Sequence, residues 1–484
     1  MAESDYTLTV GLEVHAELKT RTKMFCDSKN DPEEKRPNVN VCPVCMGHPG
    51  TLPVINKEAI AHVLRMGLAV GGDLADFTEF DRKNYFYPDI PKGYQISQYK
   101  YPLVKGGNLA GVALTRIHLE EDTAKSSHDE GDYSLVDFNR AGVPLMELVT
   151  EPVIHNPADA GRFAKELQLL LQYLGAGDAN MEKGEMRVEA NISVSKTPGV
   201  FGTKVEVKNL NSFKAVEKAI EFEMRRHIEL LEAGEKVVQE TRGWDEGAQK
   251  TFSQRLKEES HDYRYFPDPD LPKLYISHVS EFAPDALKAS LPELPWVKRE
   301  RFVKDYAMKA EDADMYTKVR GLGSYFETVA SFVGKDEKLV KLVSNYLSSD
   351  FVGLVKTSGV DIDTVLENPA SKIPAQQFAT LIGLVGKNEL SSRGAKDALK
   401  VVYEEGGDVL TIIQERNLIQ KNNADELKVV IEKIVSDNPS VVADYANGKE
   451  SALQFLVGQG MKATKGSANP SMLKELLLSI LKRS

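Results

Sequence analysis

The eleven residues Leu8–Leu18, LTVGLEVHAEL, alternate between apolar and polar side chains along their length. This alternation has the period of a β-strand with one buried face and one polar face. Met186–Val194 shows the same pattern, and shorter versions surround Ile117–Leu119 and Val205–Val207. Antiparallel sheets that cover a core with one face typically show it. The sequence therefore predicts a mostly antiparallel sheet in the first part of the chain.

Helical periodicity interrupts these strands and then takes over the chain. Residues 158–174 and 216–232 have the apolar spacing of helices. Prolines cluster in residues 266–272 and 291–295, which indicates a rigid boundary, and the chain beyond them is almost entirely helical in period. We predict an α+β fold, with the last boundary placed at Gly406-Gly407. The predicted domains are an N-terminal, mostly antiparallel β domain over residues 1–291, an all-helical domain over 292–405 and a small helical tail domain over 406–484.

Composition bounds the class of protein. The chain has 484 residues, of which 42% are hydrophobic and 27% charged, as in ordinary globular proteins. Three cysteines cannot staple a chain of this length, and no apolar run approaches the roughly 18 residues of a membrane span. The acidic start lacks the features of a signal peptide, so we expect a cytoplasmic protein with no membrane contact. A net charge of −11 limits any contact with nucleic acid to a local basic patch.

Carboxylates and one imidazole gather on the predicted strands. They are Glu13, His15 and Glu17 on the first strand, Glu120, Glu121 and Asp122 at the end of a second, and Glu147 and Glu151 on a third. Oxygen ligands with little nitrogen suit Mg²⁺, although a solvated polar face would have the same composition. Because Glu120 and Glu121 are adjacent, a straight strand directs only one of them into a shared site. We interpret His118 as a hydrogen-bonded neighbour rather than a base.

A basic and aromatic stretch, residues 80–89, reads FDRKNYFYPD. Cationic groups bind phosphate oxygens and aromatic rings stack on bases, so this composition favours a nucleotide, although a turn with surface tyrosines would look the same. The chain has no phosphate loop of the GxxxxGK[ST] type. The candidate phosphate-binding side chains are Arg82, Lys83, Arg187 and Lys208.

A cysteine pair, Cys42-Pro-Val-Cys45, has the spacing of half a zinc site, and Cys26 lies upstream. Structural zinc takes four ligands, and only three thiols exist. His48 or Asp27 could complete the set. The alternative is a loop without metal.

Several longer stretches resemble the B subunit of the bacterial tRNA-dependent amidotransferases. They occur in order over nearly the whole chain, which makes the resemblance specific. They are residues 11–18 (GLEVHAEL), 80–89, 118–122 (HLEED), 137–147 (DFNRAGVPLME), 208–213 (KNLNSF), 239–242 (QETR), 262–267 (DYRYFP) and the tail stretch from FLVGQ at residues 455–459 through NP at 469–470.

The resemblance implies a heterotrimer in which this chain joins an amidase-like A subunit, together with a small C subunit. The B subunit of such an enzyme uses ATP to phosphorylate the side-chain carboxylate of misacylated Glu-tRNA(Gln) or Asp-tRNA(Asn). Ammonia, released from glutamine in the amidase-like partner, then displaces the phosphate to give the amide. The resemblance also implies a cradle domain similar in fold to glutamine synthetase and guanidino kinases, and a tail that binds tRNA.

The resemblance further implies site residues. It places Mg²⁺ on Glu13, His15, Glu147 and one of the paired glutamates, and we predict Glu121 for the catalytic set, with Glu120 as a fifth metal ligand. In some members, zinc is held by Cys-x-Cys and Cys-x-x-Cys. Here Ser28 stands where the second thiol would be, so Cys26, Cys42 and Cys45 are expected to form at most a weakened site. Two rival hypotheses are a non-catalytic tRNA-binding scaffold and a self-contained enzyme that resembles glutamine synthetase.

Overall fold

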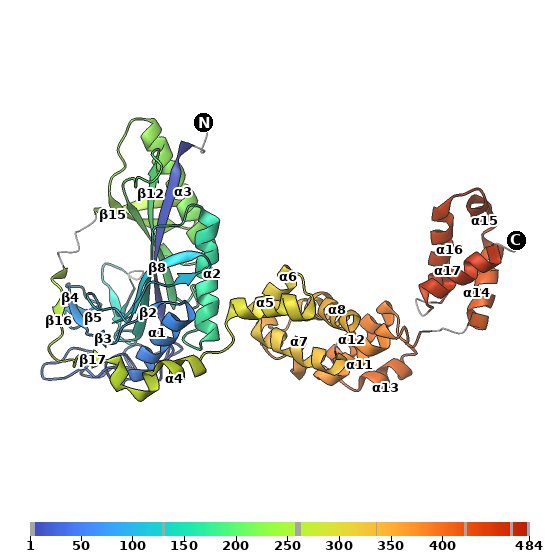
Figure 1. The fold of residues 1–484 in the computed structure, drawn as a ribbon, viewed down its shortest axis with the longest axis horizontal. Helices are drawn as coiled ribbons and strands as arrows, with labels where there is room; N and C mark the ends of the chain where they lie inside the picture. The colour runs from blue at the N-terminus through green and yellow to red at the C-terminus, as the bar shows by residue number, and fades with distance from the viewer. Residues whose placement is uncertain are drawn as a thin grey trace. The chain divides into compact units, whose positions relative to one another are not determined.

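The computed structural model describes residues 5–127, 131–256, 263–334, 336–420, 424–464 and 468–481. It divides into two compact units, Met1–Leu294 and Pro295–Ser484, which are described separately. Within the described residues, the strands lie in the first unit and the regular elements of the second unit are helices, as Figure 1 shows. The prediction of an α+β chain with a sheet-rich first part and a helical second part is confirmed.

One large sheet organises the first unit. Its strand order is β15-β14-β13-β12-β1-β11-β8-β6-β2, and β7 also pairs with β8. Neighbouring strands are antiparallel except for β13 and β14. The strands are β1 (Thr7–Glu17), β2 (Asp73–Leu74), β6 (Val104–Lys105), β7 (Asn108–Leu109), β8 (Val112–Glu121), β11 (Pro144–Thr150), β12 (Met186–Ser195), β13 (Val205–Leu210), β14 (Glu240–Asp245) and β15 (Lys250–Leu256).

Helices cover the apolar face of this sheet. Val10, Leu12 and Val14 of β1 are buried on that face, as their alternation with polar residues requires. The helices are α1 (Lys57–Ala69), α2 (Pro157–Tyr173) and α3 (Phe213–Glu232), and the short α4 (Pro284–Ala289) packs against α1. Contacts join α3 to β12, α2 to α3 and α1 to β8, and Figure 1 shows α2 and α3 on one side of the sheet. Asn156 and Ser212 cap the starts of α2 and α3.

Three small sheets lie beside the large one. They pair β9 (Lys125–Ser127) with β10 (Leu135–Asp137), β4 (Asp81–Asn84) with β5 (Tyr94–Ser97) and β16 (Phe266–Pro267), and β3 (Phe77–Thr78) with β17 (Leu274–Tyr275). The basic and aromatic stretch therefore begins on β4 and continues into a loop. Residues 263–267 lie beside it in space although they are far away in sequence.

The second unit has two separate hydrophobic clusters. The first lies between Phe302 and Ile413, and the second between Leu427 and Leu477. Helix α13 buries Val409, Ile412 and Ile413 in the first cluster. The boundary at Gly406-Gly407 stays a prediction. The helices are α5 (Pro295–Tyr306), α6 (Ala310–Lys318), α7 (Arg320–Val333), α8 (Glu337–Asn345), α9 (Val352–Thr357), α10 (Ile362–Glu367), α11 (Ala375–Gly386), α12 (Ser392–Glu405), α13 (Val409–Glu415), α14 (Ala424–Asp437), α15 (Pro439–Ala446), α16 (Glu450–Ala463) and α17 (Pro470–Leu481).

None of the helices within the described ranges combines the length and the apolar character that crossing a membrane requires.

Candidate active site

The polar face of the large sheet carries a row of side chains from four adjacent strands. Arg187 of β12 lies opposite His15 of β1, His15 lies opposite Glu147 of β11, and Glu147 lies opposite His118 of β8. Residues that are directly opposite in neighbouring strands point to the same face. The register of the sheet thus assembles residues that lie up to 172 positions apart (15 to 187) into one line.

The centre of this row is a cluster of two histidines and two carboxylates. His15 Nε2 lies 3.4 Å from Glu147 Oε2 and 3.6 Å from Glu120 Oε1. His118 Nε2 lies 3.4 Å from the same Glu147 oxygen. Glu147, Glu120 and His118 are almost fully buried. Ligand atoms of Glu13, His15 and Glu147, and likewise of His118, Glu120 and Glu147, lie within 4.8 Å of one another, close enough to bind one cation.

The carboxylates of this cluster favour a positive charge among them, either on His15 or on a bound cation. Burial alone would lower the pKa of His15, but the carboxylates of Glu147, Glu120 and Glu189 outweigh it and raise the pKa to about 9. Burial and the nearby charges of Glu147 and Glu189 raise the pKa of Glu13. Gathered carboxylates that disfavour one another's ionisation fit a site for a divalent cation. The donor set, carboxylate oxygens with imidazole nitrogen, suits Mg²⁺ or Mn²⁺.

A cavity of about 270 Å³ opens over this face. Lys208 Nζ lies 2.7 Å from Glu189 Oε2 and 3.9 Å from Glu206 Oε1, so its ammonium stands among carboxylates. Lys83 Nζ lies over the ring of Tyr263, 5.1 Å from its centroid. The rings of Tyr99 and Tyr265 are stacked with centroids 4.4 Å apart. The cavity is lined by Glu13, Lys83, Ser97, Gln98, Tyr99, Arg116, His118, Glu147, Glu206, Lys208, Thr241, Tyr263 and Tyr265.

Of the two adjacent glutamates, the structure places Glu120 and not Glu121 in the cluster. Strand β8 continues regularly through both residues, so their side chains point to opposite faces. A Glu121 oxygen lies 2.6 Å from Lys92 Nζ, and Glu121 Oε1 accepts from the Ile96 amide at 2.9 Å. The prediction that Glu121 belongs with Glu13, His15 and Glu147 therefore does not match this geometry.

Of the four predicted phosphate-binding side chains, two line the cavity and two do not. Lys83 and Lys208 line the cavity, but Arg82, next to Lys83 on β4, points away and lies 2.8 Å from both Asp268 and Asp270. Because adjacent strand residues face opposite sides, only one of Arg82 and Lys83 can reach the cavity. Arg187 lies in register with His15, but its guanidinium donates to Asp122 at 2.9 Å and does not line the cavity.

Two residues that sequence reasoning missed, Glu189 and Glu206, belong to this face, and His118, which the sequence analysis interpreted as a hydrogen-bonded neighbour, lies there as well. The sequence signal that could have identified them is their position in the alternation of apolar and polar residues along the strands. Glu189 and Glu206 occupy polar positions between buried apolar residues, and His118 is two residues before Glu120. Their convergence depends on strand register, which the sequence does not display.

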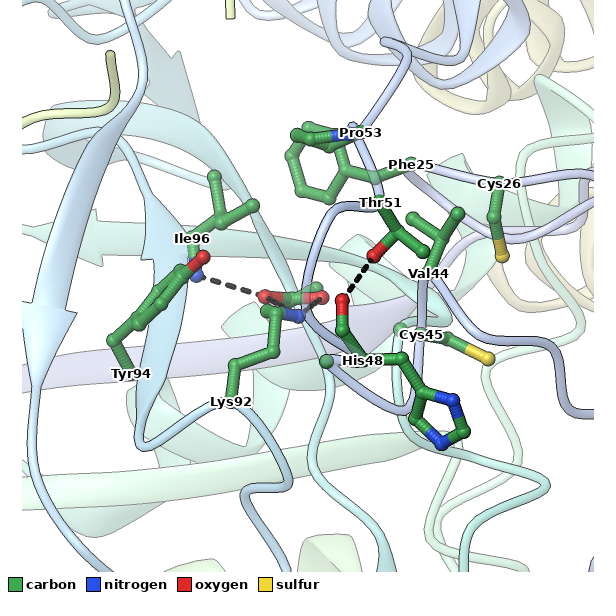
Figure 2. A pocket seen from close by; sticks show the side chains of 13 residues that line it. Phe25, Cys26, Val44, Cys45, His48, Thr51, Pro53, Lys92, Tyr94 and Ile96 are labelled. Carbon is green, nitrogen blue, oxygen red and sulfur yellow. Dashed lines mark hydrogen bonds and ion pairs between the residues drawn. The ribbon is translucent and has the colours of Figure 1, made fainter. Parts of the chain in front are cut away.

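The three cysteines converge at a second place, beside a small pocket that Glu121 also lines. Ligand atoms of Cys26, Cys42 and Cys45 lie within 4.8 Å of one another. Ser28 Oγ lies 3.8 Å from Cys45 Sγ, and the buried Lys23 Nζ lies 3.8 Å from the same sulfur. Figure 2 shows Cys26 and Cys45 at one side of a small pocket and Lys92 at the other. Three sulfurs suit zinc, and the weakened three-thiol site stays a prediction.

Comparisons with known proteins match nearly the whole length of the chain. Residues 8–280 match the family described as GatB/GatE catalytic domain, and residues 324–481 match the GatB domain. A relative from Carboxydothermus hydrogenoformans is 44% identical over 486 residues, covering 98% of each chain. Relatives from Dehalococcoides mccartyi and a Synechocystis strain are 44% and 41% identical, over 99% of this chain and 99% and 98% of theirs. All three carry the name of the B subunit of an aspartyl/glutamyl-tRNA(Asn/Gln) amidotransferase. With its sheet, its polar face and its full-length matches, the chain belongs to the family of B subunits of the tRNA-dependent amidotransferases.

Proposed function

We propose that the polar face of the large sheet carries the ATP-dependent step of a tRNA-dependent amidotransferase. In this step, the γ-phosphoryl group of ATP passes to the side-chain carboxylate of misacylated Glu-tRNA(Gln) or Asp-tRNA(Asn). Ammonia from a glutaminase partner then attacks the acyl phosphate, phosphate leaves, and Gln-tRNA(Gln) or Asn-tRNA(Asn) is released. Family membership supports the overall reaction, and the clustered ligand atoms of His15, Glu120 and Glu147 support its location.

The chemistry explains why such a face is needed. The γ-phosphate and the carboxylate are both anions, so they must be neutralised and held in line before they can react. Mg²⁺, when bound, would neutralise phosphate oxygens at this position. Glu13, His15, Glu120 and Glu147 would hold the ion, and burial of Glu120 and Glu147 keeps their oxygens fixed.

The cations and aromatic rings of the cavity suit the nucleotide. Lys83 and Lys208 are in place to contact phosphate oxygens, and Arg116, whose Nη2 lies 3.4 Å from Glu147 Oε1, adds a third positive charge beside the metal ligands. Tyr99, Tyr263 and Tyr265 offer ring faces for a base. Closing this cavity around the substrates would protect an acyl phosphate from water.

The proposal extends to partners and domains. A glutamine-dependent reaction needs a glutaminase, so the proposed partners are an amidase-like A subunit, which would supply ammonia, together with a small C subunit. A cradle similar to glutamine synthetase and guanidino kinases is proposed for the first unit, with tRNA binding by the helical end of the second. Zinc binding by Cys26, Cys42 and Cys45 remains a proposal as well.

ATP cleavage by the assembled enzyme tests this function. Without glutamine, we expect Mg²⁺-dependent release of ADP when Glu-tRNA(Gln) or Asp-tRNA(Asn) is added, because the carboxylate accepts the phosphoryl group before ammonia is needed. Correctly aminoacylated Gln-tRNA(Gln) is the control and should give only background cleavage. Cleavage that is independent of the misacylated tRNA would contradict the proposal, and cleavage with free glutamate alone would favour the enzyme resembling glutamine synthetase. A non-catalytic scaffold would leave the chemistry to another subunit, so it predicts that cleavage by the assembled enzyme survives Glu147→Ala.

A further inference from the structure

Strand β14 begins within the stretch QETR, residues 239–242, which the proposed reaction leaves without a role. Among the strand pairs that the structure describes in the large sheet, β13 and β14 are the parallel pair. Their register puts Thr241 directly beside Glu206, and Gly243 beside Lys208. The stretch therefore lies next to the part of the sheet that carries Lys208.

The side chain of Thr241 points to the polar face and holds Glu206. Thr241 Oγ1 donates to Glu206 Oε2 at 2.9 Å, and both residues are buried, at 2% and 8% exposure. The other oxygen of Glu206 lies 3.9 Å from Lys208 Nζ, and Lys208 donates to Glu189 Oε2 at 2.7 Å. Lys208 is thus fixed between two carboxylates, and the hydroxyl of Thr241 sets the position of one of them.

The opposite face of β14 anchors the strand. Arg242 Nη1 donates to Glu240 Oε1 at 2.6 Å, and Arg242 Nε lies 3.2 Å from Glu223 Oε1 of α3. Arg242 Nε also donates to Thr251 of β15. Because the alternating residues Glu240 and Arg242 tie the strand to its neighbours, Thr241 has little freedom to move away from Glu206.

We propose that Thr241 is a positioning residue that acts through Glu206 to direct the ammonium of Lys208 toward a phosphate of ATP; this inference rests on the proposed function. An ammonium has three N–H donors. Lys208 gives one to Glu189 at 2.7 Å, and at 3.9 Å Glu206 is an ion-pair partner without a hydrogen bond, so donors remain for an incoming anion. Thr241, Glu206 and Lys208 all line the cavity, beside Lys83 and the three tyrosines, where cations and rings fit a nucleoside triphosphate. The direction of the ammonium matters because a phosphate oxygen must lie within hydrogen-bond distance of Nζ to be bound.

Steady-state kinetics of the assembled enzyme with Thr241→Val and Thr241→Ser test this role. Valine keeps the β-branched shape but removes the hydroxyl, so we expect the KM for ATP to rise about tenfold, as for the loss of one hydrogen bond to a charged group. The KM for misacylated tRNA should change less than about twofold. Serine keeps the hydroxyl and should restore the KM for ATP to near the wild-type value.

Thr115→Val is the matched control. Thr115 Oγ1 also donates to a glutamate, Glu151, at 2.7 Å on the same sheet, but the pair lies outside the cavity. Its KM for ATP should match that of the wild type. A general effect of removing a threonine–glutamate bond would instead appear in both valine variants and would overturn the inference.

A double variant separates an effect of Thr241 through Glu206 from a direct contact of Thr241 with ATP. If Thr241 acts only through Glu206, adding Thr241→Val to Glu206→Gln should raise the KM for ATP by less than about twofold beyond Glu206→Gln alone. Additive effects would overturn the route through Glu206. If Thr241→Val does not assemble, Glu206→Gln alone tests the route: its KM for ATP should rise, and an unchanged KM for ATP would overturn the inference.

The result remains distinct from a failure of the proposed function. A normal KM for ATP in Thr241→Val, in an enzyme that loses amide formation when Glu147 is replaced, overturns only the role of Thr241. A rise in the KM for tRNA of the same size as that for ATP would also overturn it, because the cavity would then serve the acceptor end of tRNA.

Discussion

Replacing Glu147 with alanine is expected to abolish amide formation by the assembled amidotransferase, with a fall in rate of about 10³-fold or more. Glu147 stands at the centre of the cluster, where its carboxylate lies 3.4 Å from both His15 Nε2 and His118 Nε2. Its removal takes one ligand from the proposed metal and leaves two imidazoles without their shared partner. Glutamine hydrolysis, which belongs to a different polypeptide in the proposed complex, should persist.

Glu151→Ala is the control for this variant. Glu151 follows β11 by one residue and accepts a hydrogen bond from Thr115, outside the cluster. We expect its rate of amide formation to stay within about threefold of the wild type, as for a surface substitution. Amide formation that survives in Glu147→Ala, measured with purified Glu-tRNA(Gln), would refute the site.

The second large effect concerns stability. Glu223 of α3 is fully buried, and its carboxylate lies 2.7 Å from Arg226 Nη2 and 3.2 Å from Arg242 Nε. Glu223→Gln removes the fully buried anion between these guanidinium groups and leaves them only Glu240, 2.6 Å from Arg242 and 3.9 Å from Arg226. We therefore expect the free energy of unfolding of the first unit to fall by about 3 kcal/mol at pH 7. Urea denaturation followed by Trp244 fluorescence in a Trp296→Phe background measures it.

The pH dependence of this loss has a defined sign. Burial alone would raise the pKa of Glu223, but hydrogen bonds from His227, Arg226 and Thr251 lower it to about 2. The carboxylate therefore stabilises the folded state above the ordinary pKa of 4.5, and this contribution disappears as the pH falls toward 2. The difference between wild type and Glu223→Gln should shrink over the same range.

Glu221→Gln supplies the comparison on the same helix. The Glu221 side chain is 45% exposed and pairs with Arg225 one turn along. An exposed pair of this kind contributes about 0.5 kcal/mol or less, so the variant should unfold almost like the wild type. Equal losses in the two variants would contradict the importance of the buried network.

Alternation along Leu8–Leu18 was enough to predict the sheet and its polar face, because burial of one face imposes period two on any strand. It also placed Glu13 and His15 on the same side. The alternation could not choose between Glu120 and Glu121, since the choice depends on whether β8 stays regular to its end. It stays regular, so Glu120 joins the cluster and Glu121 turns to Lys92.

Partners across strands were beyond the reach of the sequence. The sequence analysis interpreted His118 as a hydrogen-bonded neighbour without naming its partner, and the register of β8 with β11 places it opposite Glu147. Arg82 looked as suitable as Lys83, but residues 268 and 270, far along the chain, supply the carboxylates that bind it. Such contacts follow from tertiary pairing rather than from local pattern.

The location of the metal tests the central claim most directly. Crystals of the assembled enzyme grown with Mn²⁺ in place of Mg²⁺ and a non-hydrolysable ATP analogue would show the ion by its anomalous scattering. We expect a peak within about 2.5 Å of carboxylate oxygens of Glu147 and Glu120, with His15 and the analogue's phosphate beside it. A nucleotide-bound Mn²⁺ held by Glu121, or by any residues away from this face, would contradict the account.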